Sequence, residues 1–274
     1  MWDPPLASKH PSSAAPALAW AEGVVGGSPG NSAGWHFNLC PGAGEGGGCF
    51  VSSYAPARPY VARGEARDPQ RAAQEAGRRA RTRVRRYCAA NGLNRLGTLT
   101  YGPPRATDPV VVREHIGEFF RGLRHGLGGE ALPYVWVPEL HGDGVHFHVH
   151  FAVGRYVPYR LIKETWGRGI VNIKLLGDLP VGSGVLSEAR KAAAYLSKYV
   201  TKTFTDPGTR VLGLHRYDVA QEFSPKVLRL CGVSADAVVD QASDVLGMQP
   251  AERWSSDQAE QWAGPPAIWA QWGK

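Results

Sequence analysis

The chain has 274 residues, of which 43% are hydrophobic, 10% aromatic and 20% charged, so it is long enough for one large domain or two small ones. This composition excludes a wholly disordered chain and a collagen-like one, and no apolar run approaches the roughly 18 residues that a membrane-spanning helix needs. The net charge of +7 is concentrated in residues 63–204, which is typical of a protein that binds a polyanion. The N-terminus lacks the cationic start and apolar stretch of a secretory signal, so we expect a cytoplasmic protein with no membrane partner.

Residues 1–62 are rich in glycine and proline, with 10 Gly and 8 Pro. Such a density without a period predicts a loosely ordered N-terminal arm. Two cysteines of this segment, Cys40 and Cys49, could pair or share a metal, but two free thiols are the expectation in a reducing compartment. The four cysteines of the chain form no CxxC pair, which argues against a four-cysteine zinc site.

Residues 68–90 predict a helix that Asp68 caps and Pro69 begins. The segment carries seven arginines against one glutamate, Glu75, and so many like charges repel one another without an anionic partner. The alternative is a solvated helix. We favour contacts to the backbone of nucleic acid, because the planar guanidinium can donate two hydrogen bonds to one phosphate. The predicted DNA-binding residues of this helix are Arg78, Arg79, Arg81, Arg83, Arg85 and Arg86.

The next part of the chain alternates strand and helix patterns. Period-2 alternation and β-forming residues predict strands, and apolar positions three and four residues apart predict helices. In chain order these are a strand at 96–101, a helix at 109–126, strands at 133–140 and 145–153, a short helix at 158–167, a strand at 169–175, and a helix at 186–204 that Ser187 would cap. This order predicts an α+β fold with a mainly antiparallel sheet, in a domain of residues 63–205. Residues 206–274 form a C-terminal segment of unknown role.

Three histidines alternate along the strand at 145–153. His146, His148 and His150 project from one face, because successive side chains of a strand point to opposite faces. A turn at residues 142–144 would bring Glu139 of the preceding strand close to them, and imidazole with carboxylate can bind one divalent cation. His141 is a weaker candidate. The alternatives are an exposed polar face and a hydrolytic zinc site, and the pair of histidines that binds the metal stays open, with a slight preference for His148 and His150.

The helix at 186–204 places two phenols and several ammonium groups on one stripe. At 100° per residue, Tyr195, Lys198, Tyr199 and Lys202 share a face with Lys191. A solvated surface of lysine and tyrosine is the plain alternative. The chemical interpretation is that the cations favour the phenolate and attract a phosphodiester, so that a tyrosine becomes a nucleophile and Lys202 binds DNA.

Three elements now stand in a recognisable order: LGTLTY at 96–101, VHFHVHFAV at 145–153 with Glu139 before it, and YLSKYVTK at 195–202. Together they resemble the rolling-circle replication initiators of plasmids and small phages, the HUH endonucleases. The wording around them resembles the initiators of actinobacterial plasmids. The resemblance covers roughly residues 70–205, about half of the chain.

The resemblance implies a ferredoxin-like palm with a five-stranded antiparallel sheet. It makes Tyr199 the nucleophile, Lys198 the lysine of the motif, and Tyr195 either a second nucleophile or the equivalent of a glutamate that activates water. It implies Mn²⁺ or Mg²⁺ at the histidines, nicking and strand transfer on single-stranded DNA at a replication origin, and a 5′-phosphotyrosine intermediate. No GxxxxGK[ST] motif occurs, so a host helicase and a host polymerase are expected partners.

Two alternatives to a replication initiator remain. A conjugative relaxase or a single-strand transposase would use the same chemistry on different DNA. A non-catalytic RRM-like nucleic-acid-binding module belongs to another class, and it would need exposed aromatic side chains on its sheet face, where this chain carries histidine.

Overall fold

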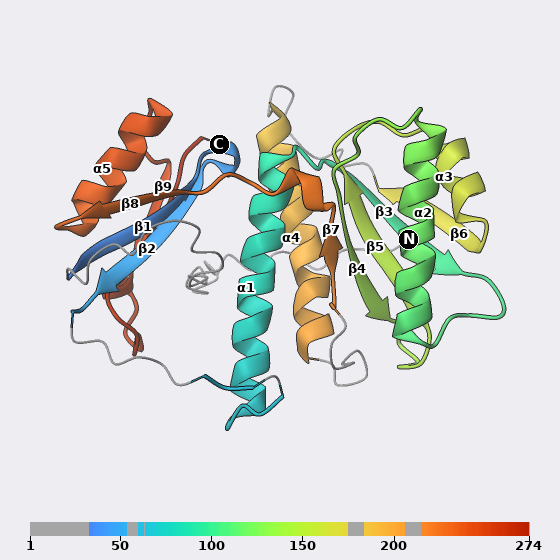
Figure 1. Cartoon of the computed structure of the whole chain (residues 1–274), viewed down its shortest axis with the longest axis horizontal. Coiled ribbons are helices and arrows are strands. Elements are labelled where there is room, and N and C mark those ends of the chain that lie inside the picture. The colour runs from blue at the N-terminus through green and yellow to red at the C-terminus, as the bar shows by residue number, and fades with distance from the viewer. Residues whose placement is uncertain (1–32, 54–59, 63, 175–183, 206–214, 274) are drawn as a thin grey trace, which may run out of the picture.

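The computed structural model describes residues 33–53, 60–62, 64–174, 184–205 and 215–273 of the chain. The described residues form two antiparallel five-stranded sheets and five α-helices. Two helices, α1 (Pro69–Ala90) and α4 (Gly184–Thr205), lie side by side between the sheets (Figure 1). The fold is therefore α+β, as the sequence predicted.

The central sheet has the ferredoxin-like strand order. Its neighbours run β6-β3-β5-β4-β7, all antiparallel, and the chain passes through strand, helix, strand, strand, helix and strand to build the first four. The strands are β3 (Arg95–Tyr101), β4 (Tyr134–Leu140), β5 (Phe147–Val153), β6 (Gly169–Lys174) and the short β7 (Asp218–Val219). The predicted order of elements is confirmed.

Each face of the central sheet is covered by two helices. On one face, α2 (Pro109–Gly126) and α3 (Tyr159–Trp166) pack on a core that includes Phe147, Val149 and Phe151 of β5. On the other face, α4 and α1 pack on a second core that includes Val137 of β4 and Ala152 of β5. The alternation of β5 therefore places its aromatic residues under α2 and its histidines under α4.

The ends of three elements test the sequence predictions. Asp68 caps α1 by accepting a hydrogen bond from the amide of Arg71, and Pro69 opens the helix, as predicted. Helix α4 begins at Gly184, so Ser187 lies inside its first turn and is not the cap. Strand β5 begins at Phe147 and not at residue 145, because the Asp143 carboxylate accepts hydrogen bonds from the amides of residues 145 and 146 and holds them in the turn.

The second sheet combines strands from both ends of the chain. Its order is β8-β1-β2-β10-β9, and α5 (Ala235–Leu246) packs on it. The strands are β1 (Gly34–Cys40), β2 (Glu45–Val51), β8 (Leu228–Gly232), β9 (Glu252–Ser255) and β10 (Ala267–Gln271). Residues 34–51 thus form a hairpin where a loosely ordered arm was expected, while residues 1–32 and 54–59 of that arm lie outside the described residues. The division into segments 1–62, 63–205 and 206–274 stays a prediction.

Glycine makes this hairpin possible. The ring of Phe37 lies so close to Gly46 that a Cβ there would stand 2.2 Å from it, and a Cβ on Gly48 would stand 2.0 Å from the carbonyl oxygen of His36. The glycine-rich composition therefore serves close packing of two strands here. All four cysteines of the chain are free thiols, which confirms the expectation for Cys40 and Cys49.

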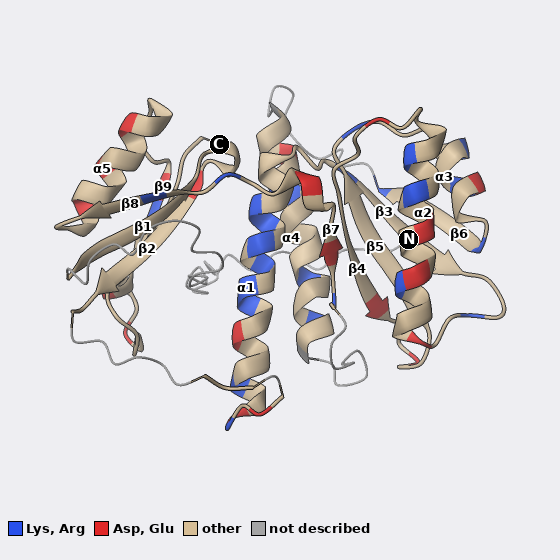
Figure 2. Cartoon of the chain, viewed as in Figure 1, with Lys and Arg blue, Asp and Glu red and all other residues tan. Residues whose placement is uncertain are grey.

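Two charged side chains join the second sheet to the central helices. The buried Glu45 of β2 accepts hydrogen bonds from Arg85 and Arg86 of α1 at 2.6, 3.0 and 2.7 Å. Arg190 of α4 donates to the carbonyl oxygens at the turn after β1 and at the end of β10, which are those of Ala43, Gly44, Trp272 and Gly273. Figure 2 shows the cations gathered along α1, and part of them serve this junction.

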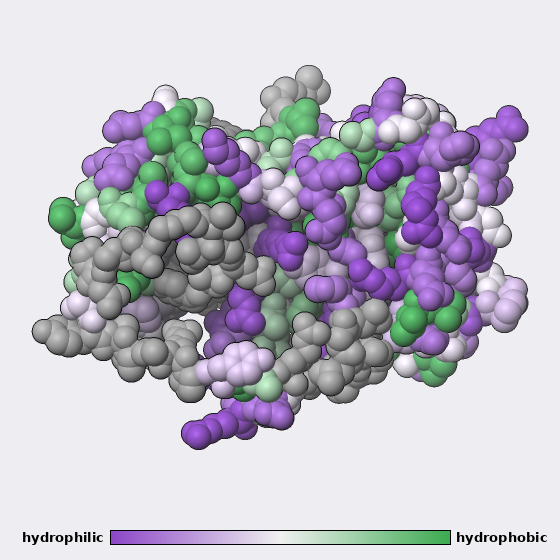
Figure 3. All heavy atoms as spheres, in the orientation of Figure 1, coloured by the Kyte–Doolittle hydropathy of each residue, from purple (hydrophilic) through white to green (hydrophobic). Residues whose placement is uncertain are grey.

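The surface differs between the two halves of the molecule. In the view of Figure 3, hydrophilic residues predominate over the side of α2, and hydrophobic surface is more prominent over the side of α5. Val233 and Val245, at the two ends of α5, are exposed. Among the described helices, none combines the length and the apolar character that a membrane crossing requires.

Candidate active site

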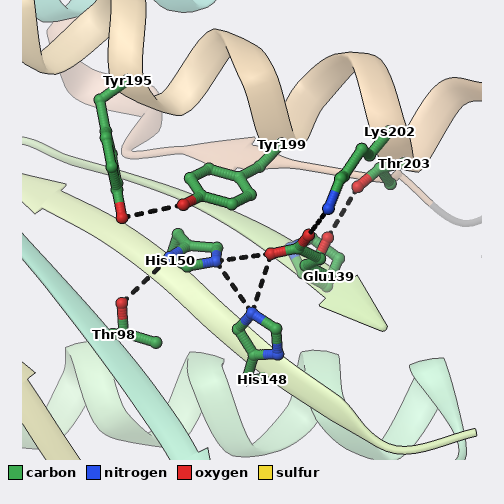
Figure 4. A network of polar contacts seen from close by, with 9 residues as sticks. Thr98, Glu139, His148, His150, Tyr195, Tyr199, Lys202 and Thr203 are labelled. Atoms are coloured by element: carbon green, nitrogen blue, oxygen red, sulfur yellow. Dashed lines mark hydrogen bonds and ion pairs between the residues drawn. The ribbon is translucent and has the colours of Figure 1, made fainter. Parts of the chain in front are cut away.

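A carboxylate and two imidazoles converge on the face of the central sheet beneath α4. Glu139 of β4 stands directly opposite His148 of β5, and His150 follows on the same face. The Nε2 atoms of both histidines lie 2.9 Å from Oε2 of Glu139 and 3.0 Å from each other (Figure 4). The hairpin therefore brings together the three residues that the sequence analysis expected to meet.

A threonine of the neighbouring strand orients one of these imidazoles. Oγ1 of Thr98 on β3 lies 3.0 Å from Nδ1 of His150, its cross-strand partner. When Nδ1–H donates to this hydroxyl, the lone pair of Nε2 points at Glu139. The other histidine, His148, has a buried Nδ1 with no hydrogen-bond partner in the described part of the chain.

Burial and hydrogen bonding set the charges of this group. Burial raises the pKa of Glu139, but the hydrogen bonds from His148, His150 and Lys202 outweigh it and hold the pKa far below its ordinary value. Burial lowers the pKa of His150, so its imidazole stays neutral, which is the form that binds a metal. The group is therefore an ionised carboxylate with a neutral imidazole beside it.

The three donor atoms fit a divalent cation. Donors at about 2.1 Å from an ion in octahedral geometry lie about 3.0 Å apart, whereas tetrahedral geometry separates them by about 3.4 Å. The observed separations of 2.9, 2.9 and 3.0 Å match the octahedral value. Lone pairs that face one another at this distance repel, and a cation among them would remove that repulsion. Glu139, His148 and His150 are thus the residues that would hold the metal.

Helix α4 places both predicted tyrosines over this group. The ring of Tyr199 stacks on the imidazole of His150, with centroids 3.6 Å apart and planes 18° apart. Its hydroxyl donates to the hydroxyl of Tyr195, one turn earlier, at 2.8 Å. Figure 4 shows the two phenols meeting above His150. The tyrosine stripe of the helix and the histidine face of the strand therefore form one site.

The lysines of the stripe differ in their surroundings. Nζ of Lys202 lies 2.6 Å from Oε1 of Glu139, so its ammonium pairs with the carboxylate of the candidate metal site. Lys198 is exposed, and its predicted catalytic role stays a prediction. Burial, the hydrogen bond to Tyr195 and the charge of Glu139 raise the pKa of Tyr199. This differs from the expectation that nearby lysines favour the phenolate, and the reason is that the closest described cation is bound to Glu139.

Two of the candidate histidines lie apart from the metal-site group. His146 precedes β5, and its Nδ1 lies 2.7 Å from the carboxylate of Asp143. The ring of His141 contacts that of His148, with centroids 4.4 Å apart, but the histidine is not part of the group of three donors. Of the pairs that the sequence left open, His148 with His150 is the pair that the fold brings to Glu139.

The arginines of α1 fall into two sets. Arg85 and Arg86 are bound to Glu45 and are occupied inside the molecule. Arg78, Arg79 and Arg83 are exposed and Arg81 is half-buried, so their predicted contacts to DNA stay a prediction. Charge density alone could not separate the sets, because Glu45 lies about 40 residues away from its partners.

Sequence reasoning missed two residues of the site. Thr98 lies on the first predicted strand, but its role depends on which strand pairs with β5. The ammonium of Lys174, at the end of β6, lies 4.4 Å from the ring centroid of Tyr195, a cation–π contact. Neither residue carries a local signal, since both meet the site only through sheet pairing and helix packing.

Comparison with known proteins agrees with this geometry. No curated protein and no solved structure matches the chain. One family model matches, over residues 94–204, and this range includes Thr98, Glu139, both site histidines and both tyrosines. Over that part of its length, the chain is similar to the replication-associated protein family of the ORF2 type, a match that supports a replication initiator.

Proposed function

We propose that this protein is a plasmid rolling-circle replication initiator of the HUH type, which nicks single-stranded DNA at an origin and transfers the strand. The observation that carries the proposal is the stacking of Tyr199 on His150, because it joins a potential nucleophile to a potential metal ligand. The match of residues 94–204 to a replication-associated family supports the same conclusion from sequence.

The metal group supplies the electrostatic part of the reaction. Glu139, His148 and His150 would hold Mn²⁺ or Mg²⁺, and either ion, when bound, supplies Lewis-acid polarisation of a phosphate oxygen. Thr98 keeps the His150 ring oriented, and Lys202 neutralises the second oxygen of Glu139.

Tyr199 would carry out the covalent step. Its phenolic oxygen forms a bond to phosphorus as the bond from phosphorus to the 3′ oxygen breaks. The phenol gives up its proton to solvent and the 3′ oxygen gains one, which leaves a 5′-phosphotyrosine and a free 3′-hydroxyl. Because its pKa is raised in the DNA-free protein, Tyr199 starts as a neutral phenol bonded to Tyr195. Tyr195, one turn away, would serve the second transfer that ends a round of replication.

Covalent capture of labelled DNA tests the proposal. Single-stranded oligonucleotides that tile the region around the coding sequence are incubated with the protein and Mn²⁺, and adducts are resolved on denaturing gels. We expect an adduct with the wild-type protein and none with Tyr199→Phe. Tyr195→Phe is expected to keep the first adduct, because it removes only the acceptor that stabilises the neutral Tyr199 phenol, and to impair the second transfer. An adduct at the wild-type rate from Tyr199→Phe would move the nucleophile to Tyr195.

The metal requirement is tested in the same assay. Excess chelator, or the combined change of His148 and His150 to alanine, is expected to abolish nicking. Undiminished nicking under either condition would refute the metal site.

The folded arrangement argues against a non-catalytic RRM-like module. Such a module binds bases on an open sheet face, but here α2 and α3 cover one face and α4 covers the other. A relaxase or a transposase would share the chemistry of the site, and the DNA that yields adducts separates these from an initiator. Nicking beside an inverted repeat near the coding region is the result expected of an initiator.

A further inference from the structure

A cavity of about 260 Å³ lies between α1 and α4, apart from the candidate active site. Five residues of α1 and two of α4 line it: Ala73, Gln74, Gly77, Arg78, Arg81, Thr201 and Phe204. The two helices run side by side in Figure 1. On the wheel of α4, Thr201 and Phe204 point away from the stripe that holds Tyr195 and Tyr199, so the cavity opens on another side of the same helix.

The cavity has an apolar wall and a cationic rim. Ala73, Gly77 and Phe204 supply the apolar part, and Arg78 and Arg81 supply the cations. The ring of Phe204 is held in place by Arg216, whose guanidinium lies 4.9 Å from the ring centroid and donates to the carbonyl oxygens at the end of α4. A flat apolar group could therefore rest against a fixed aromatic ring.

The two arginines of the rim stand one helical turn apart, and no carboxylate pairs with either of them in the described ranges of the chain. Burial and the positive charges of Arg78 and Arg85 lower the pKa of Arg81. By contrast, Arg85 has its counter-ion in Glu45. Like charges brought together at the mouth of a cavity are stabilised when an anion binds between them, and a guanidinium pair suits a phosphate.

A path leads from the tyrosines to this cavity over the exposed side of α4. Tyr195, Lys198 and Thr201 follow one another at intervals of three residues, which places each about 5–6 Å from the next on the helix surface. Lys198 is exposed in the middle of this path. A strand that lies on the catalytic face would need to cross only the width of one helix, about 10–12 Å, to reach Arg81.

We propose that this cavity binds one nucleotide of single-stranded DNA, with the base against Phe204 and a phosphate between Arg78 and Arg81. The inference rests on the proposed function only in taking that strand to be the one that is nicked. A volume of about 260 Å³ suits one nucleotide, since pockets for larger, drug-sized ligands hold about 300–1,000 Å³. The cavity would fix the register of the strand on the tyrosines.

Variants of the full chain separate the two halves of the site. Arg78→Gln and Arg81→Gln test the phosphate half, with Arg121→Gln as the matched control, because Arg121 is an exposed arginine of α2 across the sheet. Ala73→Leu fills the cavity without a change of charge. Ala72→Leu is its control, because the neighbouring Ala72 points to another side of α1 and does not line the cavity.

Binding is measured by fluorescence anisotropy at several salt concentrations. The probes are a mixed-sequence single strand of about 20 nucleotides, longer than one domain covers, and an abasic strand of the same length. We expect each rim variant to weaken binding of both probes and to reduce the salt slope by about 0.7 relative to Arg121→Gln. We expect Ala73→Leu to weaken binding of the normal strand about tenfold relative to Ala72→Leu and to leave the abasic strand unaffected.

Either half can overturn the proposal. Rim variants with the salt slope of Arg121→Gln would remove the phosphate contact. Equal binding by Ala73→Leu and Ala72→Leu would remove the base contact, and a phosphate site alone would refute the assignment to a nucleotide. The covalent adduct assay is read separately, so loss of the adduct with retained pocket effects would refute the nicking function and leave the nucleotide site standing.

Discussion

Replacing Thr98 by valine should weaken metal binding without disturbing the fold. The hydroxyl of Thr98 lies 3.0 Å from Nδ1 of His150, and His150 is only 5% exposed, so water cannot readily replace the lost partner. Groups that orient a metal ligand in this way contribute about 10–100-fold to affinity. The ring of Tyr199, stacked on His150 at 3.6 Å, also holds the imidazole in place. We therefore expect the lower value, about tenfold or about 1.4 kcal/mol.

The assay is a titration with Mn²⁺ in which electron paramagnetic resonance reports the free ion. Thr100→Val is the matched control, because Thr100 lies on the same face of β3 opposite His148. The Nδ1 of His148 has no hydrogen-bond partner in the described residues, so this variant should keep wild-type affinity. Thr98→Ser, which restores a hydroxyl, should recover most of the loss. An affinity of Thr98→Val equal to that of the wild type, or an equal loss in Thr100→Val, would refute the orienting role.

Two further predictions concern packing. Glu45→Gln is expected to lower the free energy of unfolding by about 3 kcal/mol, because its two arginine partners would keep their charge in a half-buried position. Burial raises the pKa of Glu45, but these arginines lower it further. Its contribution is therefore present above its unfolded pKa of about 4.3 and lost as the pH falls through the folded value, which urea titrations near pH 7 and pH 3 would measure. The exposed pair of Glu118 is the control, and Glu118→Gln should cost at most about 1 kcal/mol. Gly97→Ala should cost about 1–3 kcal/mol in the same titration, because its Cβ would stand 2.3 Å from the ring of Phe151, and unchanged stability would contradict this packing.

The local sequence determined the elements of the central domain and the composition of each face. Alternation along β5 put His148 and His150 on one face, and a short turn was sufficient to place Glu139 beside them. The 3.6-residue period of α4 put Tyr195 and Tyr199 on one stripe in the same way. These relations span few residues, so the periodicity of strand and helix was enough to predict them.

Side-chain details of the turn escaped the same reasoning. The pattern of three alternating histidines made His146 equivalent to the other two. The carboxylate of Asp143 instead binds the amide and the imidazole of His146 and keeps it out of the strand. A period of two says where side chains point only for residues that are in the strand.

Only the tertiary structure decided how distant segments meet. Lys202 reaches Glu139 across 63 residues, and Arg85 reaches Glu45 across 40, so neither pairing leaves a local pattern. The second sheet was missed for the same reason: β1 and β2 are rich in glycine because Phe37 packs against them, and their partner strands β8 and β10 lie near the other end of the chain. Periodicity reports the burial of a segment, but the choice among possible partners depends on packing and hydrogen bonding that exist only once the chain has folded.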